Sequence, residues 1–273
     1  MGAALRHAAG LLTVLAHQRT GSGPRPLVLL HGFLGSARNL GVLARGLAER
    51  RGDLDVVAFD LAGHGASPAL PPEPDTATLA ADVLASARAL GLATPLAIVG
   101  HSLGGRVALR AAALEPAAVG GVTLLDIAPG PLDSGGATAQ VLDAVLRVPG
   151  SFASRGEART ALVTAGLAPA LADWLLLDLE AAGDRQRWRI DRRALAGLHA
   201  QIAPEDLWPV VEGLRAWTLR CVRGAASPYV TERDARRLQA AGCPVETIEG
   251  AGHFLHAERP REVVEAVAAG LPR

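Results

Sequence analysis

The sequence contains no lysine, and every basic side chain is an arginine. This absence excludes a lysine Schiff base, a lysine-bound pyridoxal site and the lysine of a phosphate-binding loop. The 27 basic and 27 acidic side chains give a formal net charge of zero. Because binding to nucleic acid requires a sustained basic surface, we expect no nucleic-acid partner.

Cysteines and long apolar runs are also scarce. The two cysteines, Cys221 and Cys243, have no metal-type spacing, and we expect both to be reduced. No apolar run reaches the roughly 18 residues of a membrane-spanning helix. Arg6 and His7 interrupt the mildly apolar N-terminus, which we interpret as the first strands rather than a signal peptide. The expected location is the cytoplasm.

Short apolar runs alternate with helical patterns along the first 130 residues and again at the end of the chain. Strands are expected at 27–30, 56–59, 96–99, 122–125, 219–222 and 245–248, and helices at 40–47, 75–90, 103–114, 231–241 and from about 260. Such alternation is typical of right-handed βαβ units. It predicts an α/β fold with a mostly parallel sheet and helices on both faces.

The alternation breaks after Pro129, where a linker-like stretch is followed by a mostly helical pattern from about 140 to 214. We predict a core formed by residues 1–130 and 212–273, with a helical cap inserted at 131–211. Four tryptophans lie in or just after this segment: Trp174, Trp188, Trp208 and Trp217. They either line a pocket between cap and core or form a small core of the cap.

One serine lies at a predicted corner between a strand and a helix. Ser102 has Gly100 two residues before it and Gly104 two residues after it. A tight strand-to-helix turn leaves no room for side chains at those two positions. The amides at the start of the following helix favour negative charge. Ser102 is therefore a candidate nucleophile, and the alternative is a glycine-rich turn that only packs the helix on the sheet.

Three further motifs occur in a fixed order around this corner. They are LVLLHGFLGS, VVAFDLAGHGAS and, near the C-terminus, GAGHFLHAERP. Together with VGHSLGG, they resemble the oxyanion loop, the D-x-x-G-x-G-x-S turn, the histidine loop and the nucleophile elbow of the α/β-hydrolase family. The resemblance covers nearly the whole chain and implies the same fold with an inserted cap.

The resemblance also implies roles for individual residues. Ser102 is the expected nucleophile, and His253, late in the chain, is the expected base. The backbone amides of Phe33 and Leu103 are expected to form the oxyanion hole. Three other histidines receive different interpretations: His31 is structural, His101 points elsewhere, and His256 lies on the surface or behind the reacting groups.

The catalytic acid departs from the common pattern of the family. The position three residues after Gly224, where most relatives carry an aspartate, is Ser227. Asp126 ends an otherwise apolar strand, and its charge needs a partner. Small bacterial esterases of the family with the acid after the sixth strand have a similar sequence there. We predict Asp126 as the acid, with Asp234 and Glu232 as alternatives.

A basic cluster covers residues 185–193 of the predicted cap. It is either an ordinary solvated face or a rim that attracts an anionic acyl group or an acidic carrier protein. These features predict a serine hydrolase that cleaves small-molecule esters of short- to medium-chain acyl groups through an acyl-enzyme, without a metal or organic cofactor.

Two kinds of alternative remain open. The same serine, histidine and aspartate suit carbon–carbon bond hydrolysis, thioester hydrolysis or a vitamin-pathway lyase, because the fold does not separate these reactions. A protein of another class, which senses a ligand without turnover, is the second alternative.

Overall fold

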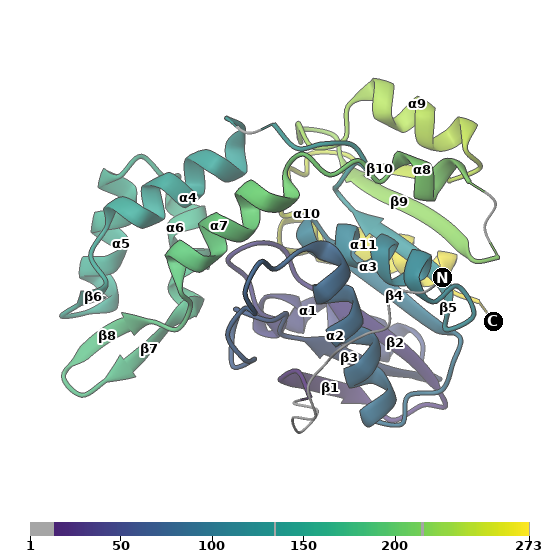
Figure 1. Ribbon diagram of the computed structural model, residues 1–273, viewed down its shortest axis with the longest axis horizontal. Coiled ribbons are helices and arrows are strands. Elements are labelled where there is room, and N and C mark those ends of the chain that lie inside the picture. Colours follow the sequence, from purple (N-terminus) through teal and green to yellow (C-terminus); the bar gives the residue numbers. More distant parts are fainter. Residues whose placement is uncertain (1–13, 134, 214–215, 273) are drawn as a thin grey trace.

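The computed structural model describes residues 14–133, 135–213 and 216–272 (Figure 1). Within them, a seven-stranded sheet has the strand order β1-β3-β2-β4-β5-β9-β10. The strands are β1 (His17–Gly21), β2 (Arg25–Leu30), β3 (Leu54–Phe59), β4 (Leu96–His101), β5 (Val119–Leu125), β9 (Thr218–Gly224) and β10 (Val245–Ile248). Only β1 pairs antiparallel in this sheet. The predicted α/β fold with a mostly parallel sheet is confirmed.

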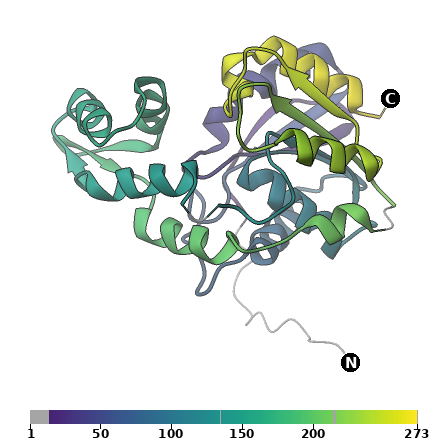
Figure 2. The same ribbon diagram turned by 90° about the horizontal axis from the view of Figure 1, so that it is seen from above.

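Helices cover both faces of this sheet, as Figure 2 shows from above. On one face lie α1 (Gly41–Arg50), α10 (Leu255–Glu258) and α11 (Pro260–Gly270), and on the other lie α2 (Thr76–Ala89), α3 (Leu103–Leu114) and α8 (Trp208–Glu212). Helix α9 (Glu232–Ala240) follows β9. Strand β2 is apolar throughout its buried part because Leu27 and Leu29 enter one core while Val28 and Leu30 enter the other.

The segment between β5 and α8 forms a separate group of elements, coloured teal to green at the left of Figure 1. Its helices are α4 (Ala137–Arg147), α5 (Arg155–Thr164), α6 (Pro169–Leu175) and α7 (Arg192–Ile202). It also contains an antiparallel sheet of β6 (Ser151–Phe152), β8 (Arg185–Trp188) and β7 (Leu179–Ala182), which the helical pattern did not predict. Helix α8 already contacts α3 of the core. The limits 131–211 given above for the cap stay a prediction.

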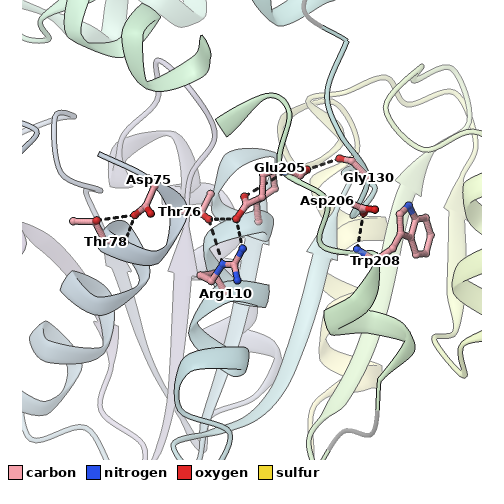
Figure 3. A network of polar contacts seen from close by, with 9 residues as sticks. Asp75, Thr76, Thr78, Arg110, Gly130, Glu205, Asp206 and Trp208 are labelled. Atoms are coloured by element: carbon pink, nitrogen blue, oxygen red, sulfur yellow. Dashed lines mark hydrogen bonds and ion pairs between the residues drawn. The ribbon is translucent and has the colours of Figure 1, made fainter. Parts of the chain in front are cut away.

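Both connections of this segment are fixed to helix α3 by one buried side chain. Arg106, with 0% of its side chain exposed, donates to the carbonyl of Gly130 at 2.7 Å and to that of Glu205 at 2.6 Å. The carboxylate of Glu205 accepts a hydrogen bond from Thr76 at 2.6 Å and pairs with Arg110 (Figure 3). The first and last parts of the insertion are thereby tied to the helix that begins beside Ser102.

None of the helices in the described part of the chain combines the length and the apolar character needed to cross a lipid bilayer. Both cysteines are buried and neither forms a disulfide; Cys221 lies on β9 and Cys243 lies in the loop before β10.

Candidate active site

Ser102 lies at the sharp corner between β4 and α3. Its backbone is in the left-handed region, with φ 51° and ψ −116°. A Cβ atom on Gly100 would lie 2.2 Å from the carbonyl oxygen of Gly104, and one on Gly104 would lie 2.4 Å from that of Leu30. Side chains at both positions would therefore collide with backbone, which is the requirement predicted for this turn.

The loop after β2 approaches the same corner. A Cβ atom on Gly32 would lie 3.1 Å from the Cβ of Ser102. Leu103 is the first residue of α3, where amides have no partner within the helix. The amide of Phe33 donates to no other residue in the described ranges. Two amides are thus available next to Ser102, and they are the two that the resemblance implies for an oxyanion hole.

His31 holds this loop in place. Its Nε2 accepts a hydrogen bond from the amide of Leu61 at 2.9 Å, and its Nδ1 donates to the carbonyl of Gly32 at 2.8 Å. Both ring nitrogens are therefore occupied by backbone groups. Burial lowers the pKa of His31 to about 4, so the ring is neutral at pH 7. The position of His31 fits the structural role expected for it.

Asp126 and His253 meet directly. Asp126 follows β5 with a φ of 53°, and its side chain is 0% exposed. The Nδ1 atom of His253 donates to Oδ2 of Asp126 at 2.7 Å, while the amide of Gly224 donates to Oδ1 at 2.9 Å. A buried carboxylate in this position orients the imidazole and stabilises its protonated form.

Ser227 is a third partner of the same carboxylate, because its hydroxyl donates a hydrogen bond to Oδ2 of Asp126. The structure does not bring Asp234 or Glu232 to His253. Asp234 caps helix α9 by accepting from Thr231 at 2.6 Å, and Glu232 pairs with Arg223. Sequence reasoning assigned no role to Ser227, although its place three residues after Gly224 was a usable signal.

His101 and His256 lie buried behind the imidazole of His253. Nε2 of His101 donates to the backbone carbonyl of His253 at 2.8 Å, and its ring centroid is 4.5 Å from that of His256. His256 is only 2% exposed, so the surface position considered for it is wrong and the position behind the reacting groups is correct. Burial, with the neighbouring histidines, lowers the pKa of both rings.

Tyr229, the single tyrosine of the chain, stacks on His253. The ring centroids are 3.8 Å apart and the planes are inclined by 22°. The Tyr229 hydroxyl shares a hydrogen bond of 2.7 Å with Thr138 at the start of α4. Sequence reasoning missed this contact, because nothing local to residue 229 places it against a loop 24 residues away.

Ser102 and His253 open into one mostly apolar cavity of about 210 Å³. We call it the catalytic cavity; its walls are Gly32, Phe33, Leu34, His101, Ser102, Ala137, Thr138, Val141, Leu171, Trp174, Pro228, Tyr229, His253 and Phe254. The four tryptophans therefore do not share one role. Trp174 lines the cavity, Trp188 packs against Phe152 within the insertion, and Trp208 and Trp217 are buried.

The basic cluster at 185–193 lies on β8, the short segment after it and the start of helix α7. Several of its guanidinium groups are engaged within the insertion. Arg187 and Arg189 pair with Glu180, and Arg192 donates to the carbonyl of Val145 at 2.7 Å. The acidic carrier protein stays a prediction.

Comparisons with known proteins show the family of the chain. A family model described as the alpha/beta hydrolase family matches residues 27–266. Esterase YbfF of Escherichia coli is 30% identical over 248 residues, which cover 89% of this chain and 91% of that protein. Lipase LipV of Mycobacterium tuberculosis is 32% identical over 266 residues, covering 93% and 96% of the two chains.

A solved structure described as a marine microorganism esterase has a similar fold. It superposes with a TM-score of 0.82 at 26% sequence identity, covering 95% of this chain and all of that one. Sequence and structural relatives therefore share both the fold and the names of ester-cleaving enzymes.

Proposed function

Because the chain belongs to the α/β-hydrolase family, we propose that it is a serine hydrolase that cleaves carboxylic esters, with Ser102, His253 and Asp126 as its catalytic triad. The observation that carries the proposal is the 2.7 Å contact between His253 and the buried Asp126, at a cavity into which Ser102 also opens. The esterase and lipase names of the relatives support an ester as the substrate.

Acylation begins when Oγ of Ser102 attacks the carbonyl carbon of the ester. Nε2 of His253 takes the hydroxyl proton, and the electron pair of the carbonyl moves onto its oxygen. The amides of Phe33 and Leu103 stabilise that oxyanion; the loss of one such donor typically costs about 100- to 1000-fold in rate. The intermediate collapses, the ester C–O bond breaks, and His253 returns its proton to the leaving alcohol.

Deacylation repeats the sequence with water as the nucleophile. His253 takes a proton from water, the resulting hydroxide attacks the acyl carbon, and the bond to Ser102 breaks with the proton returned to Oγ. Asp126 stays ionised and stabilises the imidazolium in both steps. The proposed chemistry uses these three side chains, the two backbone amides and water.

The size of the catalytic cavity suggests the length of the acyl group. Its volume of about 210 Å³ lies below the roughly 300–1,000 Å³ of pockets for drug-sized ligands. We infer that short- to medium-chain acyl groups fit. We also infer that the insertion acts as a cap over the catalytic cavity. Three of its residues, Val141, Leu171 and Trp174, supply an apolar wall of that cavity.

The test is hydrolysis of p-nitrophenyl esters from acetate to decanoate by the wild type and by Ser102→Ala. We expect many turnovers by the wild type, a maximum at short to medium chains, and no turnover by the alanine variant. An inactive wild type on every ester, or an alanine variant that retains the activity, would overturn the proposal. Acyl thioesters and β-diketones in the same panel would then identify the reaction.

A further inference from the structure

A second cavity, of about 310 Å³, adjoins the catalytic cavity. We call it the annex. The two cavities share four wall residues, Ala137, Thr138, Pro228 and Tyr229. The hydrogen bond between Thr138 and Tyr229 therefore spans the boundary between them. Beyond this boundary the annex is bordered by the linker after β5 and by His199 of helix α7.

The annex adjoins the side of the site from which the alcohol departs. The leaving oxygen must receive its proton from His253, so the alcohol lies next to that imidazole. Tyr229, which stacks on His253 at 3.8 Å, is also a wall of the annex. Leu171 and Trp174 line only the catalytic cavity, where they suit an apolar acyl chain.

His199 is a wall residue of the annex and carries a buried ring nitrogen that has no partner in the described part of the chain. The residue is 5% exposed, and its Nε2 has no hydrogen-bond partner among the described residues. Its ring packs edge-on against Phe33, with centroids 5.4 Å apart. Burial lowers the pKa of His199, so the ring is neutral at pH 7. A neutral imidazole nitrogen donates to or accepts from a hydroxyl, depending on its tautomer.

The charges at the annex disfavour anions. Asp133 and Asp234 are among its walls, and the described residues that line it include no arginine. Asp234 is engaged with Thr231, whereas Asp133 lies exposed on the linker. A carboxylate or phosphate group would meet these charges without a cation to balance them, while an uncharged hydroxyl would not.

We propose that the annex binds a hydroxyl-bearing leaving alcohol and that Nε2 of His199 forms the hydrogen bond that selects it. The inference rests on the proposed ester hydrolysis and makes His199 a specificity-determining residue. A site that hydrogen-bonds a substrate hydroxyl discriminates against the analogue that lacks it, because the polar group of the protein is then left unpaired.

The experiment uses butanoate esters in matched pairs. One series has 2-hydroxyethyl, 3-hydroxypropyl and 4-hydroxybutyl alcohols; the other replaces the terminal hydroxyl by methyl. We expect the wild type to show a higher kcat/KM for the hydroxyl member of at least one pair. The preference is the ratio of kcat/KM for the hydroxyl ester to that for its methyl partner. We expect this ratio to fall by about 5- to 30-fold in His199→Phe, which keeps a ring against Phe33 but removes the nitrogens. His199→Gln, which restores a polar group, recovers part of it.

His17→Phe is the matched control, because His17 lies exposed on β1 and is a wall of neither cavity. It leaves the preference unchanged. A wild type that shows no preference in any pair overturns the inference even if His199→Phe does not fold. A His199→Phe enzyme that keeps the preference also overturns the inference.

Failure of the broader proposal has a different signature. If the wild type hydrolyses p-nitrophenyl butanoate and Ser102→Ala does not, ester hydrolysis stands and the matched pairs decide the role of the annex. If the wild type hydrolyses none of these esters, the proposed reaction is wrong, and the inference that the annex binds the alcohol is wrong as well.

Discussion

Ser227 donates a hydrogen bond to Oδ2 of Asp126, the oxygen that also accepts from His253. The two residues belong to neighbouring strands, since Asp126 follows β5 and Ser227 follows β9. The serine occupies the position at which the resemblance led us to look for an aspartate. The proposed acid, Asp126, and the position at which the resemblance implies an acid, residue 227, are therefore far apart along the chain but in contact in the fold.

Asp126→Asn should abolish most of the activity while the fold persists. The amide keeps the shape of the carboxylate but removes the charge that stabilises the imidazolium, so we expect kcat to fall by about 1,000- to 10,000-fold. The measurement is the steady-state rate on p-nitrophenyl butanoate. Glu232→Gln serves as the control, because Glu232 pairs with Arg223 and should change the rate little. Equal losses in the two variants would contradict the assignment.

Moving the acid to residue 227 should restore part of the lost rate. Ser227 already contacts the oxygen that receives Nδ1 of His253, so a carboxylate placed there is near the same imidazole. We expect Asp126→Asn/Ser227→Asp to exceed Asp126→Asn by at least about tenfold, because it regains a charge-assisted hydrogen bond. Ser227→Ala alone should cost no more than about tenfold.

A double variant no more active than Asp126→Asn would show that the backbone after β9 cannot present a carboxylate to His253. Circular dichroism of both variants separates this result from loss of folding.

Sequence reasoning succeeded where the chemistry imposes a local pattern. The elbow at Ser102 needs glycines at fixed offsets, and the collisions at Gly100 and Gly104 give the reason. The contact of Asp126 with His253 agrees with the argument that a charge at the end of an apolar strand needs a partner. The mostly parallel sheet follows from the alternation of apolar runs and helical patterns.

The remaining features depend on contacts between distant segments. Tyr229, Thr138 and His199 meet the site from three different elements, and no spacing in the chain relates them. The strands of the insertion have two to four residues, which is too short for an alternating pattern to show. Burial of His256 likewise depends on how helix α10 packs against His101 of β4.

Arg106 should be important for stability because it binds the carbonyls of both Gly130 and Glu205 from a fully buried position. Arg106→Met leaves both carbonyls without this partner, while the Glu205 carboxylate keeps Thr76 and Arg110. We expect the free energy of unfolding to fall by about 3–5 kcal/mol, the usual cost of breaking a buried pair. Urea denaturation measures it.

Arg88→Met is the matched control for Arg106→Met, because the Arg88–Glu115 pair is exposed and should contribute less than about 1 kcal/mol. Comparable losses in the two variants would contradict a structural role for the buried guanidinium.

Asp178 should make stability depend on pH. It lies in the short 3₁₀ turn Leu176–Asp178 of the insertion, is 1% exposed, and has no hydrogen-bond partner for either carboxylate oxygen among the described residues. Burial, with a smaller contribution from the negative charge of Asp60, raises the pKa of Asp178 to about 8. In the unfolded chain the same group titrates near the ordinary value of 3.8.

The folded state therefore holds more protons than the unfolded state between about pH 4 and pH 8, so this group lowers stability as pH rises through that window. Asp178→Asn cannot ionise. We expect the free energy of unfolding of the variant, relative to the wild type, to increase by roughly 2–4 kcal/mol between pH 4 and pH 8. Taking the difference removes the opposite pH dependence of the buried histidines. Asp184→Asn, in the exposed turn between β7 and β8, should show no such increase. If the difference in the free energy of unfolding between Asp178→Asn and the wild type stays constant with pH, Asp178 is ionised in the folded protein and is paired with a cation.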